Sequence, residues 1–230
     1  MLRKILLGCG AVSSALYVVT DIVAARRYEG YSYADQWFSE LTADGSPTRP
    51  LLIGINAIPY TALVAAFAAG VWKTAGQNRA QRITAGLLGG YAAAGAMGGI
   101  AFPMQMRQND ATLRNVMHIP STMVMSLCVT LAMGFGARTL GTRFRKYSYG
   151  TIAAVVAFGV LTSTQAGRIS ENQPTPWAGA EERVNIFATM LWIAALSIGL
   201  MRAHGLISSA RERTPTVPRL PTRQQLRHLR

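Results

Sequence analysis

The side chains able to do chemistry lie near the ends of long apolar segments in this sequence. Ser39, His118 and an acid, either Asp21 or Glu40, are the residue types that serve as nucleophile, base and orienting acid in covalent catalysis. Three different segments carry them, so their spacing does not by itself define an active site. Further polar residues belong to the same candidate cluster and suit ligand binding or mutual pairing, namely Gln105, Arg107, Glu182 and Arg183.

The candidate cluster supports three interpretations. It is typical of a protein that binds or transports a small ligand or a lipid. It also fits a structural role, in which either glutamate, Glu40 or Glu182, pairs with one of the arginines and fixes a loop to a helix end. Charges inside a membrane cost at least about 2.5–3.5 kcal/mol on insertion scales, so they persist when paired or functional. The alternative is an intramembrane hydrolase or transferase for lipid headgroups, using the serine, the histidine and an acid.

The sequence does not predict a metal or haem site. His118 is the only histidine in an apolar segment, whereas zinc sites use three or four ligands. A haem relay needs pairs of axial ligands, which the chain lacks unless methionines serve. Cys9 and Cys128 both lie in apolar segments and are interpreted as small packing residues. We therefore expect no cofactor.

Six apolar segments must position the cluster. About 20 apolar residues cross a bilayer core about 30 Å thick. Of the 230 residues, 50% are hydrophobic and only 14% are charged, whereas a soluble domain carries about a quarter of its residues as charges. The pattern predicts an all-α, polytopic membrane protein with a six-helix transmembrane bundle over residues 1–203, its spans lying approximately at 5–25, 51–71, 83–102, 116–137, 149–166 and 184–201.

The basic residues sort to one side of this arrangement. With the N-terminus inside, 16 of the 23 Lys and Arg residues fall in cytoplasmic segments. Nine of the ten acids fall in the first span or outside. The net charge of +13 therefore follows from membrane topology, and nucleic-acid binding is not expected. We predict a multi-pass protein of the cell (cytoplasmic) membrane with both termini cytoplasmic and the candidate cluster on the extracytoplasmic face.

The two ends of the chain are both basic. Arg3 and Lys4 before an apolar run also fit a cleaved signal peptide. Asp21 interrupts the region before the cleavage site, so retention of the first span is favoured. Residues 204–230 are rich in Arg and Pro and cannot bury a core. We expect them to form a disordered cytoplasmic tail that lies against anionic lipids.

Small residues and a proline indicate how the helices pack. The third span carries glycines that permit close helix approach in lipid, at Gly86, Gly90, Gly95 and Gly99. Internal packing is favoured over an oligomer interface for this surface. In the second span, Pro59 follows Asn56 by three residues, frees a backbone carbonyl and predicts a kink.

Several of these residues occur in motifs that resemble a known family. The motifs are Ser39-Glu40-Leu41 with Gly45-Ser46-Pro47, Phe102-Pro103, Thr112 followed by His118, and Glu182-Arg183. Together they resemble DUF998, a family of six-span bacterial and archaeal membrane proteins of unknown function, from the first span to the sixth. The resemblance implies a fold and a membrane location but no activity. Family members usually carry Asp two residues after Phe-Pro, where this chain has Gln105.

Overall fold

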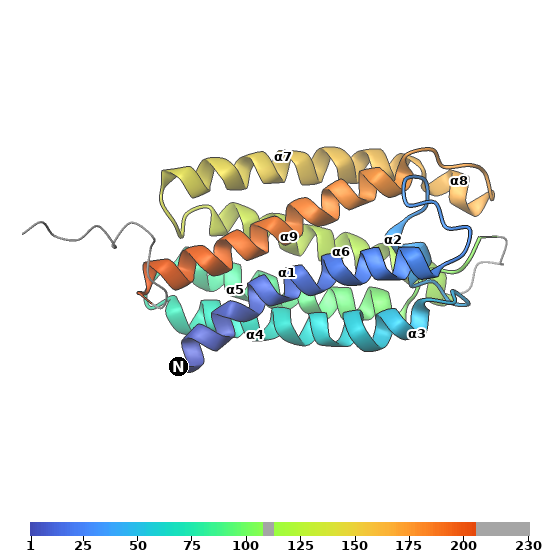
Figure 1. Cartoon of the computed structure of the whole chain (residues 1–230). Helices are drawn as coiled ribbons and strands as arrows, with labels where there is room; N and C mark the ends of the chain where they lie inside the picture. Colours follow the sequence, from blue (N-terminus) through green and yellow to red (C-terminus); the bar gives the residue numbers. More distant parts are fainter. Residues whose placement is uncertain (108–112, 206–230) are drawn as a thin grey trace, which may run out of the picture.

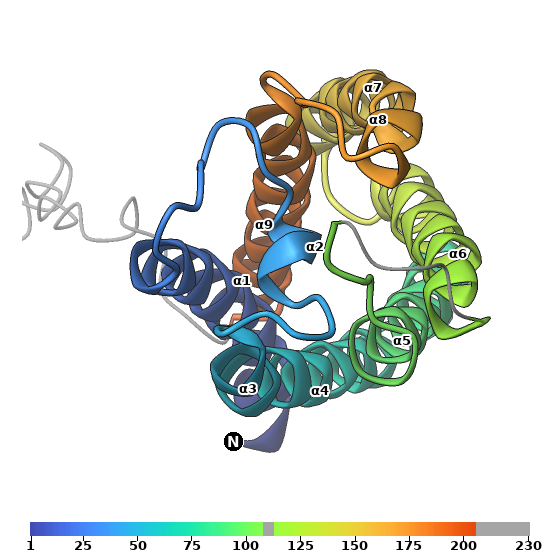
Figure 2. The same ribbon diagram turned by 90° about the vertical axis from the view of Figure 1, so that its right-hand side faces the viewer.

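Six long helices form a ring (Figures 1 and 2). The computed structural model describes residues 1–107 and 113–205. The long helices are α1 (Leu2–Arg27), α4 (Ile58–Thr74), α5 (Arg79–Ala96), α6 (Leu113–Gly136), α7 (Thr142–Thr164) and α9 (Ala178–Ala203). Each packs against the next one in this order, and α9 returns to pack against α1. Within the described ranges the secondary structure is helical, apart from one isolated bridge between Asp44 and Gln105.

Six helical segments are long and apolar enough to cross a membrane, the second of them running continuously through α3 (Arg49–Leu52) and a π-helical turn into α4, so the predicted all-α, polytopic architecture is confirmed. The observed helices extend beyond the apolar segments, most of all at α7, which begins at Thr142 rather than near Tyr149. The extra turns carry Arg143, Arg145 and Lys146, which are exposed. A helix does not end where its apolar side chains end, because its hydrogen bonds are made within the backbone.

Two π-helical turns interrupt the second and third spans. The first, η1 (Ile53–Ala57), lies between the short helix α3 (Arg49–Leu52) and α4, and ends two residues before Pro59. A proline ring clashes with the carbonyl four residues earlier, here that of Ile55, and a wider turn relieves the clash. The expected effect of Pro59 thus takes the form of a π-helical turn. The second turn, η2 (Met97–Ala101), ends α5.

The interior of the bundle combines apolar packing with single hydrogen bonds between helices. Trp192, Phe67 and Leu88 are among its largest fully buried side chains. The hydroxyls of Tyr60 and Tyr91 lie 2.7 Å apart, and Trp192 Nε1 donates to Ser148 Oγ over 3.0 Å. Lipid provides no hydrophobic gain for helix association, so close packing and such bonds hold the helices together.

Glycines permit the closest helix contacts, but only some of those in the predicted pattern do so. A Cβ on Gly90 would lie 3.2 Å from Cys128 Sγ, and one on Gly95 would lie 3.3 Å from Met125 Sδ, so both glycines face α6. Neither Gly86 nor Gly99 has an atom within 4 Å of such a Cβ. α1 and α4 approach each other closely at Gly70, whose added Cβ would lie 2.9 Å from the backbone of Leu6.

Both termini of the described bundle lie at the same end, which we call the terminal end (Figure 1). There His204 Nε2 lies 3.1 Å from the carbonyl of Thr74, which connects the end of α9 to that of α4. At the opposite end, the cap end, residues 28–48 fold back over the helices. Of the predicted basic tail, residues 204–230, all but the first two residues lie outside the described part of the chain, as does Thr112.

Candidate functional site

Residues 28–48, which we call the cap, place a short helix over the middle of the bundle. Seen from the cap end, α2 (Phe38–Leu41) lies inside the ring of long helices (Figure 2). Phe38 and Leu41 are buried and pack with Ala24 of α1 and Leu52 of α3. Burial of these two apolar side chains therefore anchors the cap to the bundle.

Hydroxyl groups fix the turn that follows α2. Ser46 Oγ and Thr48 Oγ1 both donate to the carbonyl of Leu41, over 2.9 and 2.8 Å. Carbonyls at a helix end have no partner within the helix, so these two side chains satisfy an otherwise unpaired group. The chain then returns to the membrane through Arg49, whose Nε lies 3.3 Å from Asp44 Oδ1.

The first of three polar contacts that hold the cap joins α1 to α9. Arg183 binds Asp21 in a bidentate pair, with Nε to Oδ2 at 3.0 Å and Nη2 to Oδ1 at 2.9 Å. The side chains of Asp21 and Arg183 are 1% and 3% exposed, respectively. The Tyr33 hydroxyl also donates to Asp21 Oδ2 over 2.7 Å. Tyr33 belongs to the cap, so the buried pair holds both helices and the cap.

Arg183 makes further contacts with the cap. Its Nη1 donates to the carbonyls of Tyr33 and Gln36, and its Nη2 donates to the Tyr31 hydroxyl. The guanidinium carbon lies 3.7 Å from the centre of the Tyr33 ring, in a cation–π arrangement. Burial and the hydrogen bond to Asp21 raise the pKa of Tyr33 to about 12. Tyr33 therefore stays neutral and continues to donate at physiological pH.

The second contact joins α2 to the loop before α6. Arg107 binds Glu40 with Nε to Oε2 at 2.8 Å and Nη2 to Oε1 at 2.9 Å. Glu40 Oε1 also accepts from the backbone N–H of Trp37, which caps α2. Arg107 further donates to the carbonyl of Gln173 and the hydroxyl of Thr175. The hydrogen bond to Glu40 raises the pKa of Arg107, and this one arginine connects three loops of the cap end.

The third contact places a carboxylate at the start of α2. Glu182 accepts hydrogen bonds from the backbone N–H of Phe38 and from Ser39 Oγ, the latter over 3.1 Å. The N–H groups of a first helical turn have no partner within the helix and favour a negative charge. Glu182 itself lies in the first turns of α9, so one carboxylate connects two helix N-termini.

His118 lies apart from these three contacts. Its Nδ1 lies 3.1 Å from the carbonyl of Gly98 and 2.8 Å from that of Phe102. Carbonyls only accept, so Nδ1 carries the proton and the other ring nitrogen, Nε2, is the acceptor in the neutral ring. The histidine thus satisfies carbonyls at the π-helical turn η2. Gln105 lies beside Asp44, whose backbone N–H donates to the Met104 carbonyl.

Comparison with known proteins identifies the family of this chain. The model of one family, described as a protein of unknown function (DUF998), matches residues 11–199. The chain belongs to the DUF998 family. This confirms the resemblance given by its motifs, since the match runs from α1 into α9. No curated protein and no solved structure matches the chain.

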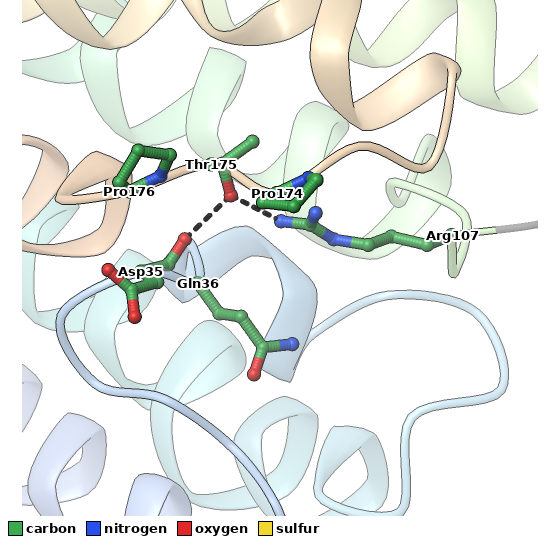
Figure 3. A pocket seen from close by; sticks show the side chains of 6 residues that line it. All are labelled: Asp35, Gln36, Arg107, Pro174, Thr175 and Pro176. Atoms are coloured by element: carbon green, nitrogen blue, oxygen red, sulfur yellow. Dashed lines mark hydrogen bonds between the residues drawn. The ribbon is translucent and has the colours of Figure 1, made fainter.

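An open recess of about 340 Å³ lies on the surface of the DUF998 protein at the cap end, lined by Asp35, Gln36, Arg107, Pro174, Thr175 and Pro176 (Figure 3). We call it the Arg107 recess. Thr175 Oγ1 donates to the Asp35 carbonyl over 2.8 Å and accepts from Arg107 Nη2 over 2.7 Å. Figure 3 shows the Asp35 carboxylate and the Arg107 guanidinium on opposite sides of this hydroxyl.

The structure brings the sequence candidates together in pairs. Asp21 lies with Arg183, Glu40 with Arg107, and Ser39 with Glu182. The hydrogen bonds of Ser39 and of His118 go to different partners. In the described part of the DUF998 protein, no group of three His, Cys, Asp or Glu side chains is placed as if to hold a metal ion.

Sequence reasoning missed the loop residues that complete these contacts. Tyr31 and Tyr33 surround Arg183, while Asp35 and Thr175 lie at the recess. The aromatic residues of the cap were available as a signal, because an arginine near a membrane interface is often packed against tyrosines. No sequence pattern predicts the hydrogen bond between Thr175 and Asp35, since 140 positions separate them.

Proposed function

We propose that this DUF998 protein binds a small ligand or a lipid headgroup in the Arg107 recess. The observation that carries the proposal is the recess itself, which brings a guanidinium, a carboxylate and an amide to one open hollow of about 340 Å³. Small-molecule sites commonly begin at about 300 Å³ and use a few convergent polar groups. Arg107 is at once a lining residue and the group that fixes α2, so occupancy of the recess is coupled to the cap.

We further propose that the cap end faces the outside of the cell membrane and that both termini are cytoplasmic. All described basic residues at the terminal end, among them Lys73, Arg82 and Arg143, lack a carboxylate neighbour in sequence. The carboxylates instead accompany the cap, as Asp35 and Glu40 do. Cytoplasmic loops of membrane proteins carry the excess of Lys and Arg, which supports this orientation.

Native mass spectrometry of the purified protein, released from detergent after incubation with a mixture of phospholipids, tests the proposal. We expect the wild type to retain one lipid and Pro174→Trp, which fills the exposed rim of the recess without changing an ion pair, to lose it. Arg49→Gln serves as the control, because Arg49 directly follows the cap, at the start of α3, and does not line the recess. Equal retention by the wild type and Pro174→Trp would overturn the proposal.

A lipid-headgroup hydrolase or transferase is the second candidate, favoured by the contact between Ser39 Oγ and Glu182 Oε1. A carboxylate beside a hydroxyl is an arrangement that permits general-base activation of the oxygen. If this candidate is correct, membranes incubated with lipid extract release a product, and Ser39→Ala stops the release. Equal turnover by Ser39→Ala and the wild type would remove Ser39 from any such role.

A further inference from the structure

We propose that the Arg107 recess recognises a zwitterionic phosphoethanolamine group, its ammonium bound at Asp35 and its phosphate at Arg107 and Gln36. The inference rests on the proposed function and names the class of ligand for the same site. It is carried by two residues of opposite charge, Asp35 and Arg107, that line one open recess and lie on opposite sides of Thr175 (Figure 3).

The Asp35 side supplies a fixed negative charge. Its Oδ2 accepts from Ser32 Oγ over 2.8 Å, and its Oδ1 accepts from the backbone N–H of Trp177 over 3.0 Å. These two bonds lower the pKa of the Asp35 carboxyl, so it is ionised at neutral pH. A carboxylate has about four acceptor positions, and those that Ser32 and Trp177 do not occupy suit the three N–H donors of an ammonium group.

The Arg107 side supplies donors. Bonds to Glu40, Gln173 and Thr175 occupy four of the five guanidinium N–H groups, as far as the described residues show. One Nη1–H is left, and Gln36 keeps one amide N–H beyond its bond to Glu40. Two N–H groups at the recess therefore suit two oxygens of a phosphate, which binds arginine well.

The charge balance of the recess favours a ligand with a cationic end. Asp35 and Arg107 are the charged residues among those that line the recess, and Arg107 is already paired with Glu40, so the Asp35 carboxylate is the lining charge that has no ion pair among these residues. A purely anionic headgroup would meet the guanidinium but would be repelled by Asp35. A phosphoethanolamine group places opposite charges against both ends.

Trp177 points to a lipid as the source of this group. Its backbone has a φ of 65°, a strained value for a large side chain, and its N–H is held by Asp35. The side chain is 67% exposed at the start of α9, next to the recess-lining Pro176. An exposed tryptophan at the end of a membrane helix is typical of the interface where headgroups lie.

The test compares phosphatidylethanolamine with phosphatidylglycerol in native mass spectrometry of the full chain. We expect the wild type to retain phosphatidylethanolamine roughly tenfold better, and Asp35→Asn to lose this preference, because one charge-assisted contact is removed. Glu29→Gln is the matched control, since it removes an exposed carboxylate of the same cap away from the recess. The control is expected to keep the wild-type preference.

Two results separate the inference from the proposed function. The first result is that the wild type and Asp35→Asn retain phosphatidylglycerol equally well, while Pro174→Trp loses it. This result would overturn the inference and leave the proposed function standing. Retention of both lipids regardless of Pro174→Trp would overturn both. A thermal-shift measurement with soluble phosphoethanolamine and with the lipid identifies the source of the group. If soluble phosphoethanolamine stabilises the wild type but not Asp35→Asn, the ligand is a free molecule. If only the lipid stabilises the wild type, and again not Asp35→Asn, the ligand comes from the membrane. Stabilisation by neither would overturn the inference.

Discussion

Replacing Asp21 with Asn is expected to destabilise the protein strongly. Asp21 and Arg183 are 1% and 3% exposed, so the substitution leaves a guanidinium inside the bundle without its counter-charge. Removing one partner of a buried pair costs about 3–5 kcal/mol. The change also weakens the hydrogen bond from Tyr33, through which the pair holds the cap.

The predicted loss converts into a measurable change of melting temperature. A chain of this length shifts by about 2–4 °C per kcal/mol, so Asp21→Asn should melt about 6–20 °C lower than the wild type. Intrinsic fluorescence during heating in detergent measures this. Asp44→Asn is the matched control, because that carboxylate is 41% exposed and lies 3.3 Å from Arg49. An exposed pair contributes at most about 1 kcal/mol.

Equal shifts for Asp21→Asn and Asp44→Asn would refute the reasoning. The double variant Asp21→Asn with Arg183→Gln tests the cause, since it removes both charges and leaves none unpaired. We expect it to melt above the single Asp21→Asn variant. A double variant that melts lower, by the sum of two separate losses, would show that an unpaired charge is not the source of the instability.

Three further predictions concern packing, the cap and pH. Gly70→Ala should destabilise the bundle through a clash with the α1 backbone, whereas Gly86→Ala, which meets no atom within 4 Å, should not; equal melting temperatures would contradict this. Leu41 is fully buried, so a cysteine placed there by Leu41→Cys, in a background without native cysteines, should react slowly with a membrane-impermeant maleimide. Adding Glu40→Gln should speed the reaction, and an unchanged rate would show that this ion pair does not hold the cap. The raised pKa of Tyr33, about 12, predicts stability that is lost as pH rises from about 10 to 12, because the unfolded chain ionises first. Tyr33→Phe should flatten this loss, and an identical pH profile would contradict the assignment.

The transmembrane architecture could be predicted from the sequence because a bilayer imposes a length on every span. Apolar runs near 20 residues placed all six helices, including α9, whose apolar part begins at Val184. The ends of the helices are harder to predict from sequence. Polar first turns, such as Ala178 to Arg183 of α9, belong to the helix but give no apolar signal. At Pro59 the sequence predicts a kink and not the π-helical turn that the structure shows, since a proline does not determine how the backbone adapts.

The candidate cluster was predictable in its membership but not in its pairing. Charged residues in or next to an apolar segment are conspicuous, and the sequence predicts Asp21, inside the first span, and Arg183, just before the sixth, as members of the cluster. Which acid meets which arginine depends on how the cap folds back, and that depends on burial of Phe38 and Leu41. The sequence next to Asp21 or Arg183 does not predict that the two side chains pair, because 162 positions separate them.

Hydrogen exchange of the cap tests the central claim, that polar side chains from α9 and the loop before α6 hold α2 against the bundle. The backbone N–H groups of Trp37 and Phe38 donate to Glu40 and Glu182, so a peptide covering residues 36–42 should exchange slowly in the wild type and faster in Glu40→Gln. Exchange of this peptide in the wild type at the rate of an unstructured chain would contradict the account.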